Sequence, residues 1–412
     1  MKLKFFLVLY ILTYGFTASA QSKGSDVVIG TNYIIQSQIL NQERGIQVYL
    51  PDSYETESDK RYPVLYVLDG QWYFANGVAV QKSLRTPGFI PEMIVVGILN
   101  KNPLRRTLFS SESEKFTLFL EKEVLSFIDA TFRTNDDRIL FGWENSANYT
   151  SQMILSAKNL FNGAIATNGG YANLEQIKKF NARKNPSDRY LYIANSKKDI
   201  YSIDFSEELS RLLTKEEPNH LIWKYELFND EIHESLAHIA LYKGLTYYYH
   251  NYPKPDFESI QDYLNRGGLS YLKEYYKERG ERFGINTEIN NSTKNTLIWL
   301  AWRRDNFEYF TFFMDEFKDV LVTNRYQSAY WQNRLGQFYL KYKDYDHAIQ
   351  YFEFGIQNYP DPKRMTTMYN GLGDAYSGKG MKKDALSAYN KSLEIDADQT
   401  QIKEKVKQIT KR

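Results

Sequence analysis

Residues Arg138 to Ala147 combine a short apolar strand pattern with a sharp turn and the start of a helix. Ile139 to Phe141 is apolar, and Gly142, Glu144 and Ser146 follow it. A strand, turn and helix in this order expose the side chain at the turn, as in the G-x-S-x-G nucleophile elbow. A carboxylate or a hydroxyl at such a turn can form a covalent ester with a substrate. Glu144 and Ser146 are therefore candidate reactive groups.

Four segments resemble one branch of the α/β hydrolases, which includes enterochelin esterases and esterase D-like enzymes, some with a helical-repeat tail. In chain order they are Arg61 to Gly70 (RYPVLYVLDG), Ile90 to Ile98 (IPEMIVVGI), Arg138 to Ala147, and Leu160 to Ala166 (LFNGAIA). The resemblance covers roughly residues 44–249. It implies an α/β-hydrolase fold and hydrolysis of carboxylic esters through an acyl-enzyme.

The elbow departs from the pattern of this family, which is Gly-His-Ser-x-Gly-Gly. Aligned on Gly142, Trp143 takes the place of His and Glu144 that of the nucleophilic Ser, while Ser146 and Ala147 replace the two glycines. Glycines at an elbow permit close packing of strand, turn and helix. The elbow position itself is strained, so we expect both changes to alter geometry as well as chemistry.

Three interpretations of the elbow are open. Ser146 could be a displaced nucleophile, although it lies two residues into the following helix. Glu144 could form a covalent ester, as the elbow aspartate does in haloalkane dehalogenases and epoxide hydrolases. In the third interpretation, which we favour, serine-hydrolase chemistry has been lost, and the pocket is vestigial or binds a ligand without turnover.

The resemblance also implies a base and an orienting acid further along the chain. His233 stands where the family has its His-bearing loop, and Asp199 stands where it has its acid, with Asp204 as the second choice. The order Glu144, Asp199, His233 matches the hydrolase order of nucleophile, acid and base. The plainer interpretations are a loop imidazole for His233 and a solvated turn carboxylate for Asp199.

Backbone N–H groups would complete this site. The resemblance implies oxyanion donors at Gln71 or Trp72 and at Asn145. If Glu144 and His233 face one another, we expect an ion pair in place of a Ser–His hydrogen bond. A carboxylate next to an imidazole favours the imidazolium and removes the free base that acyl transfer needs.

Composition excludes several other chemistries. The chain of 412 residues contains no cysteine, which excludes disulfides, a thiol nucleophile and thiolate metal sites. No pair among its five histidines has the spacing of a zinc motif, and we expect neither a metal nor a cofactor. Lys and Arg number 52 against 50 Asp and Glu, and the charges balance without Lys2 and Lys4. A nucleic-acid partner is therefore not expected.

Eight apolar runs predict the strands that position the site residues. They are Tyr33–Leu40, Ile46–Leu50, Val64–Leu68, Met93–Leu99, Arg138–Phe141, Gly163–Ala166, Tyr190–Ala194 and Leu221–Leu227. Helix-length segments such as 112–131 and 147–157 separate the later runs, which is typical of buried parallel strands with crossovers. The first two runs lie close together and alternate more, which predicts an antiparallel edge hairpin. We expect a mostly parallel, eight-stranded α/β-hydrolase sheet covered on both faces.

After Tyr252-Pro253-Lys254-Pro255 the strand pattern ends, and the chain to Arg412 has a helical pattern. Six positions of this part recur, in the same or a similar residue type, 37 residues later. The first set is Leu335, Gly336, Tyr339, Ala348, Phe352 and Ile356, and the second set is Leu372, Gly373, Tyr376, Ala385, Tyr389 and Leu393. With Pro360 as a terminal proline, this pattern resembles the tetratricopeptide repeat, whose usual period is about 34 residues. The two repeats span about 330–360 and 367–397.

A third, degenerate hairpin is predicted upstream at about 293–320. Leu297, Ala301 and Phe307 would lie on its first helix and turn, and Phe310 and Met314 on its second helix. Such a unit is expected because repeats need neighbours to bury their apolar faces. The polar segment 399–412 is predicted to be a solvated capping helix.

The first twenty residues have the pattern of a secretory signal peptide. Met1 to Lys4 is basic, Phe5 to Phe16 is apolar, and Ala18-Ser19-Ala20 is a small-x-small cleavage site. The apolar run is short for a membrane span of roughly 20 residues. We expect an exported protein, periplasmic or extracellular, that begins near Gln21 and has no later membrane span.

The predicted organisation is a signal peptide (1–20), an α/β-hydrolase domain (25–252) and a helical domain (257–412). The predicted function is that of an exported esterase-family hydrolase, catalytically impaired because Glu144 replaces the nucleophilic Ser. Its ligand would be an ester-type small molecule. The alternative is a non-catalytic binding or scaffold protein that holds a protein or peptide partner through its helical repeats.

Overall fold

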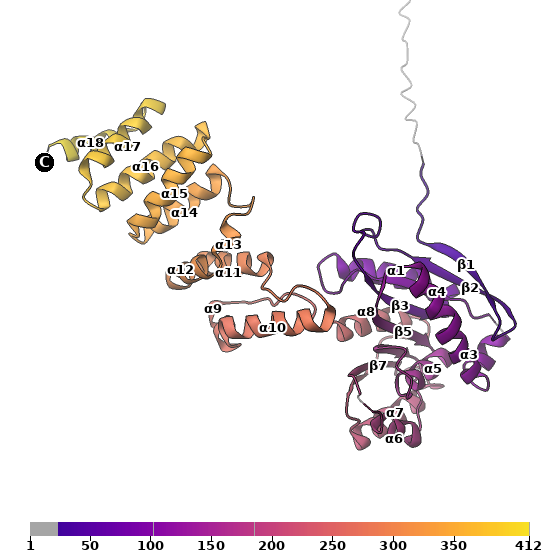
Figure 1. Cartoon of the computed structure of the whole chain (residues 1–412). Helices are drawn as coiled ribbons and strands as arrows, with labels where there is room; N and C mark the ends of the chain where they lie inside the picture. The colour runs from indigo at the N-terminus through magenta and orange to yellow at the C-terminus, as the bar shows by residue number, and fades with distance from the viewer. Residues whose placement is uncertain (1–23, 102, 185, 412) are drawn as a thin grey trace, which may run out of the picture. The chain divides into compact units, whose positions relative to one another are not determined.

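The structure is a computed structural model that describes residues 24–101, 103–184 and 186–411 (Figure 1). The predicted signal peptide lies outside these residues. Contacts divide the chain into two compact units, and the boundary along the chain falls between His250 and Asn251. Each unit has its own hydrophobic core, and each is described by itself.

The first unit is built on an eight-stranded sheet in the order β1-β2-β4-β3-β5-β6-β7-β8. Its strands are β1 (Thr31–Ser37), β2 (Gln42–Tyr49), β3 (Tyr62–Leu68), β4 (Ile94–Ile98), β5 (Thr134–Trp143), β6 (Gly163–Thr167), β7 (Arg189–Ser196) and β8 (Leu221–Phe228). β1 and β2 form an antiparallel hairpin at one edge, β2 pairs antiparallel with β4, and β3 to β8 run parallel. The predicted sheet and its edge hairpin are confirmed.

Helices cover both faces of this sheet (Figure 1). On one face lie α1 (Gly70–Arg85) and α8 (Leu236–Tyr248), where Gly77 comes close to Val67 and Val95, and Gly244 to Ile165. The other face is covered by α5 (Asn145–Ile154) and by a helical run of α3 (Ser113–Phe119), η1 (Leu120–Leu125) and α4 (Ser126–Thr131). The remaining helices of this unit are α2 (Leu104–Leu108), α6 (Leu174–Asn181) and α7 (Ile203–Glu216).

β5 is longer than predicted. The apolar run at 138–141 predicted a short strand, whereas β5 covers Thr134–Trp143. Its polar first part pairs with β3 only at Thr134 and Tyr62, before a register shift leads to the pair of Arg138 and Val64. The hydrophobic pattern misses this part because several of its side chains are partly exposed and need not be apolar.

The second unit is entirely helical among its described residues. Its helices are α9 (Ile260–Asn265), α10 (Gly268–Phe283), α11 (Asn291–Arg303), α12 (Phe307–Glu316), α13 (Lys318–Leu321), α14 (Ala329–Lys341), α15 (Tyr345–Asn358), α16 (Pro362–Gly378), α17 (Lys382–Ile395) and α18 (Thr400–Thr410). Six of them are preceded by a residue whose side chain accepts a backbone N–H of the first turn, namely Ser259, Asn290, Asn306, Ser328, Asp344 and Asp361. No helix of the described chain is both long and apolar enough to cross a membrane.

The two predicted repeats form the hairpins α14–α15 and α16–α17. Gly336 and Gly373 hold equivalent places, since a Cβ would lie 2.7 Å from the Phe352 ring at Gly336 and 2.4 Å from the Tyr389 ring at Gly373. The hairpin predicted upstream is α11–α12. Phe307, expected at its first helix and turn, is instead the first residue of α12. α18 occupies the predicted C-terminal helix.

A substitution at Gly336 tests this close approach of α14 to α15. Gly336→Ala places a methyl group against the Phe352 ring, so we expect the helical unit to lose about 1–3 kcal/mol of unfolding free energy. Scanning calorimetry of the full chain should show the loss in one unit only. Gln337→Ala, at an exposed neighbour, should change stability by less than about 0.5 kcal/mol. A Gly336→Ala variant as stable as the parent would contradict the packing described.

Candidate functional site

The candidate site lies at the carboxyl edge of the parallel strands, where ligands of α/β sheets usually bind. Residues that follow different strands meet there because the strands all end at the same edge. They are Asp69 after β3, Glu144 after β5, Asn168 after β6, Asp199 after β7 and His233 after β8.

Glu144 occupies a strained turn between β5 and α5. Its φ of 59° and ψ of −119° lie where residues other than glycine are seldom found. Its amide donates to the carbonyl oxygen of Thr167 at 3.0 Å, which ties the turn to the end of β6. Gly142 permits the close approach of α5, since a Cβ there would lie 2.3 Å from the carbonyl oxygen of Ser146. A carboxylate thus stands at a sharp elbow.

The residues that replace the family glycines fit inside the elbow. Ser146 is fully buried, and its hydroxyl donates to Oδ2 of Asp69 at 2.8 Å and accepts from the Trp143 amide at 2.8 Å. Ala147 faces Gly169, where a Cβ would lie 3.0 Å from that of Ala147. The burial of Ser146 keeps its hydroxyl away from any ligand, which argues against a displaced nucleophile.

Arg105 links Glu144 to a buried carboxylate. Its Nε and Nη2 donate to Asp69 at 2.8 and 2.9 Å, and its Nη1 donates to Glu144 at 2.8 Å. The side chains of Asp69 and Arg105 are 0% and 5% exposed, whereas that of Glu144 is 39% exposed. Burial by itself lowers the pKa of Arg105. The hydrogen bonds and the negative charges of Asp69 and Glu144 outweigh this effect, so the pKa of Arg105 is raised. The rings of Trp72 and Trp143 flank the guanidinium.

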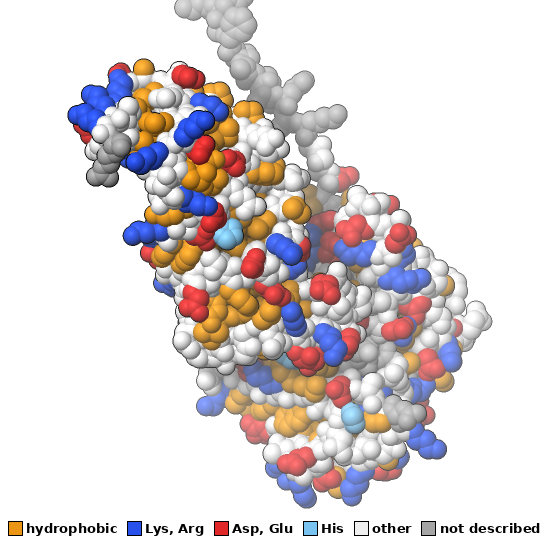
Figure 2. Space-filling view, turned by 60° about the vertical axis from the view of Figure 1, so that its left-hand side comes forward, with side chains coloured by type: hydrophobic (Ala, Val, Ile, Leu, Met, Phe, Trp, Pro, Cys, Tyr) orange, Lys and Arg blue, Asp and Glu red, His pale blue; other side chains and the backbone are white. Residues whose placement is uncertain are grey.

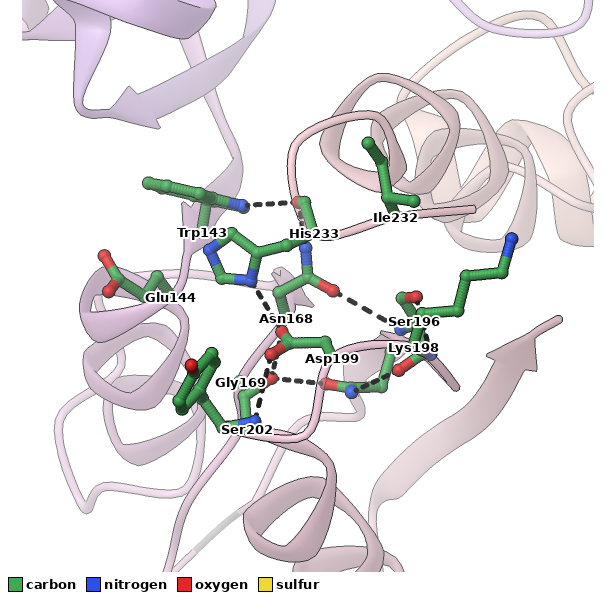
Figure 3. A network of polar contacts seen from close by, with 12 residues as sticks. Trp143, Glu144, Asn168, Gly169, Ser196, Lys198, Asp199, Ser202, Ile232 and His233 are labelled. Atoms are coloured by element: carbon green, nitrogen blue, oxygen red, sulfur yellow. Dashed lines mark hydrogen bonds and ion pairs between the residues drawn. The ribbon is translucent and has the colours of Figure 1, made fainter. Parts of the chain in front are cut away.

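His233 and Asp199 meet in the loops after β8 and β7. Nδ1 of His233 lies 2.7 Å from Oδ2 of Asp199, whose side chain is fully buried. The hydroxyl of Ser202 donates to the same oxygen at 2.5 Å, and the amide of Tyr201 donates to Oδ1 at 3.2 Å. The second ring nitrogen of His233 faces the side on which Glu144 lies (Figure 3). This orientation suits an imidazole held by a carboxylate.

Two further side chains hold the loop that carries His233. Nε1 of Trp143 donates to the carbonyl oxygen of His233 at 3.2 Å, and the two rings lie 4.8 Å apart. The amide group of Asn168 donates to the same carbonyl and accepts from the backbone of Ser196 (Figure 3). Asn168 therefore ties together the loops after β6, β7 and β8.

The ion pair considered between Glu144 and His233 does not form. Within the described residues, Glu144 pairs with Arg105 instead, because the guanidinium offers a charge-assisted hydrogen bond. His233 pairs with Asp199 and not with Asp204, which is exposed on α7.

The candidate oxyanion amides lie at the start of α1 and α5. In the part of the chain that the structure describes, the amides of Gln71 and Asn145 have no protein acceptor. The Trp72 amide, by contrast, donates to the carbonyl oxygen of Asp69 at 2.9 Å, because Asp69 is left-handed and closes the first turn of α1. Trp72 is therefore not a free donor. The Gln71 side chain bonds the backbone of Asn100 and anchors this turn.

A pocket of about 370 Å³ opens at these residues. Its lining is mixed in charge and partly aromatic, and includes Glu144, Asp199, Lys198, Tyr201, Phe205 and His233. The described residues contain no group of three or more His, Asp or Glu side chains that could hold a metal ion. The pocket offers carboxylate, amide, imidazole and ammonium groups to a small ligand.

The sequence reasoning missed Asp69, Arg105 and Asn168. Asp69 and Asn168 each follow a strand and precede a glycine, and both have positive φ (57° and 49°), so a strand-end turn could have pointed to them. Arg105 carries no such local signal. Its partners Asp69 and Glu144 lie 36 and 39 residues away in the chain.

Removal of the buried carboxylate tests the role of Arg105. Asp69→Ala leaves its guanidinium buried without its main partner, so we expect a loss of about 3–5 kcal/mol in unfolding free energy. Asp52→Ala removes an exposed carboxylate that also pairs with an arginine, Arg85, and should cost no more than about 1 kcal/mol. Urea denaturation of the full chain compares the two variants. Equal losses would show that the buried pair is dispensable.

Comparison with known proteins extends these findings. Residues 37–166 match the family model described as "Putative esterase", and residues 332–362 and 366–399 match the tetratricopeptide repeat model. The esterase match includes the elbow but ends before Asp199 and His233. The comparison with curated proteins gives no significant match.

Two solved structures share the fold at low sequence identity. An IroE-like serine hydrolase from Shewanella oneidensis is 20% identical, with a TM-score of 0.53, over 69% of this chain and 98% of its own. An uncharacterised protein from Capnocytophaga ochracea is 15% identical, with a TM-score of 0.57, over 93% of this chain and 100% of its own. The chain therefore carries an esterase-type α/β-hydrolase domain followed by tetratricopeptide repeats.

Proposed function

We propose that the hydrolase unit binds an ester-type small molecule without serine-hydrolase turnover, in a protein that is exported. The observation that carries this proposal is the place of Glu144. Its backbone has the strained elbow conformation, yet its side chain is a carboxylate held by Arg105 at 2.8 Å. The only hydroxyl of the elbow, on Ser146, is buried and bonded to Asp69.

The pairing with Arg105 also weakens the case for Glu144 as a covalent nucleophile. A carboxylate that accepts a charge-assisted hydrogen bond must give up part of that interaction to attack a substrate. The His233–Asp199 pair, the free amides of Gln71 and Asn145 and the pocket persist around it. These groups can orient a carbonyl compound even where no acyl-enzyme forms.

Restoration of a hydroxyl at the elbow tests the proposal. The parent protein should neither hydrolyse short acyl esters nor react with a fluorophosphonate probe. Glu144→Ser places a hydroxyl on the strained turn, with His233 held by Asp199 on the same side (Figure 3). We therefore expect probe labelling to appear in this variant. Adding His233→Ala should slow labelling by about 10²-fold or more, because the general base is lost.

A matched control distinguishes labelling at the elbow from labelling at another position in the pocket. Glu234 also lines the pocket but lies off the elbow, so Glu234→Ser should not be labelled. Ester hydrolysis by the parent that disappears in Glu144→Gln would instead establish a carboxylate nucleophile. Labelling of the parent at Ser146 would establish the displaced serine.

Export is proposed from the first twenty residues. A basic start, an apolar run and a small-x-small site precede Gln21. Expression of the full gene in a bacterial host, followed by mass spectrometry of the N-terminus, should find a mature chain that begins near Gln21. A protein that retains Met1 in the cytoplasmic fraction would contradict export.

A second function, that of a scaffold that holds a protein partner through the helical unit, is favoured by one observation. Arg325 and Arg334 lie on aromatic rings of this unit, and neither forms an ion pair within the described residues.

A further inference from the structure

The first helices of two successive hairpins, α11 and α14, carry an aromatic cluster with arginines on it. Trp299 and Trp302 come from α11, and Trp331 from α14. The Trp331 ring lies 5.9 Å from that of Trp299 and 6.1 Å from that of Trp302. All three side chains are partly exposed. We call these three residues, with Tyr330 and Arg334, the tryptophan platform.

Arg334 lies at the centre of the platform. Its guanidinium is 4.9 Å from the Trp302 ring, 5.2 Å from Tyr330, and 5.3 Å from both Trp299 and Trp331. Its Nη1 also donates to the hydroxyl of Tyr330. A cation over the faces of several rings is stabilised by their quadrupoles, and its orientation is fixed.

The charge on the platform is not neutralised. Arg325 lies 5.3 Å from the Trp331 ring, the same distance as Arg334, so two guanidinium groups share one ring. Within the described residues neither arginine has a carboxylate within 4.0 Å. A third arginine, Arg364, lies 4.8 Å from the Tyr330 ring and is paired with Asp361, so of these three described arginines only Arg325 and Arg334 lack a counter-ion at the platform. Two like charges without a counter-ion repel one another, and an added carboxylate would relieve the repulsion.

We propose that the tryptophan platform is a docking site for an acidic segment of a protein partner, with a Glu or Asp side chain paired to Arg334. The rings supply apolar area beside the charge, which suits a segment that carries aromatic as well as acidic residues. This inference deepens the second candidate function, the scaffold, and does not depend on the hydrolase pocket.

A peptide fits the platform better than a nucleic acid. The chain has 52 basic against 50 acidic residues, and the visible face of the helical unit mixes both signs around its apolar patches (Figure 2). A polyanion favours a continuous basic field, which is not seen there.

The test uses the full mature chain and a fluorescein-labelled random copolymer of Glu and Tyr, titrated by fluorescence anisotropy. We expect saturable binding that weakens as salt rises. Arg334→Gln should raise the dissociation constant about tenfold, because one partly desolvated ion pair is lost. Arg266→Gln removes an arginine of the same unit that is already paired with Asp262, and it should leave binding unchanged.

A second variant shows whether a loss of binding comes from the loss of the free guanidinium and not from misfolding. Tyr330→Glu sets a carboxylate one helical turn before Arg334, where an i,i+4 ion pair stabilises the helix while it occupies the guanidinium. It should keep the melting temperature of the parent and lose binding at least as strongly as Arg334→Gln. The proposal is overturned if the copolymer does not bind, if Tyr330→Glu binds it as the parent does, or if polyuridylate binds more tightly than the copolymer in an Arg334-dependent way.

Discussion

The guanidinium of Arg105 is the group on which the hydrolase site depends. A buried carboxylate such as Asp69 requires a paired charge, since an isolated one would cost several kcal/mol. Arg105 meets that requirement with two hydrogen bonds, and in doing so it fixes α2 against the turn after β3. Its Nη1 donates to Glu144, and its Nη2 also donates to the carbonyl oxygen of Trp143. The elbow carboxylate is therefore placed by a structural ion pair.

This arrangement separates two halves of a site that a serine hydrolase would couple. On one side, Arg105 holds Glu144; on the other, Asp199 holds His233. The imidazole lacks a hydroxyl to deprotonate at the elbow, yet its loop is firmly held by Trp143 and Asn168. These two hydrogen bonds fix the loop after β8 at the edge of the sheet and so hold His233 beside Asp199.

The helical unit is organised by a different constraint, the close approach of paired helices. Gly336 and Gly373 leave room for aromatic rings that fill the space between helices, and many rings meet edge to face along the unit. Aromatic packing of this kind buries large area in a thin, repetitive structure. It also leaves rings of α11 and α14 partly exposed, and Arg334 lies across them.

The sequence by itself determined the features that rest on local order. The eight strands, the turn at Glu144, the repeats with their 37-residue offset and the loops that carry Asp199 and His233 follow from periodicity, turn residues and family motifs. The exact start of β5 did not follow, because its polar residues lie partly exposed and carry no hydrophobic pattern.

Only the tertiary structure decided which partner each polar group takes. Glu144 bonds Arg105 and not His233, Ser146 turns inward to Asp69, and the Trp72 amide is used by the turn of Asp69. These choices depend on side chains that come from separate loops and compete for the same donors at the edge of the sheet. A sequence pattern records what a residue can donate or accept, whereas the distance between loops decides which of those bonds forms.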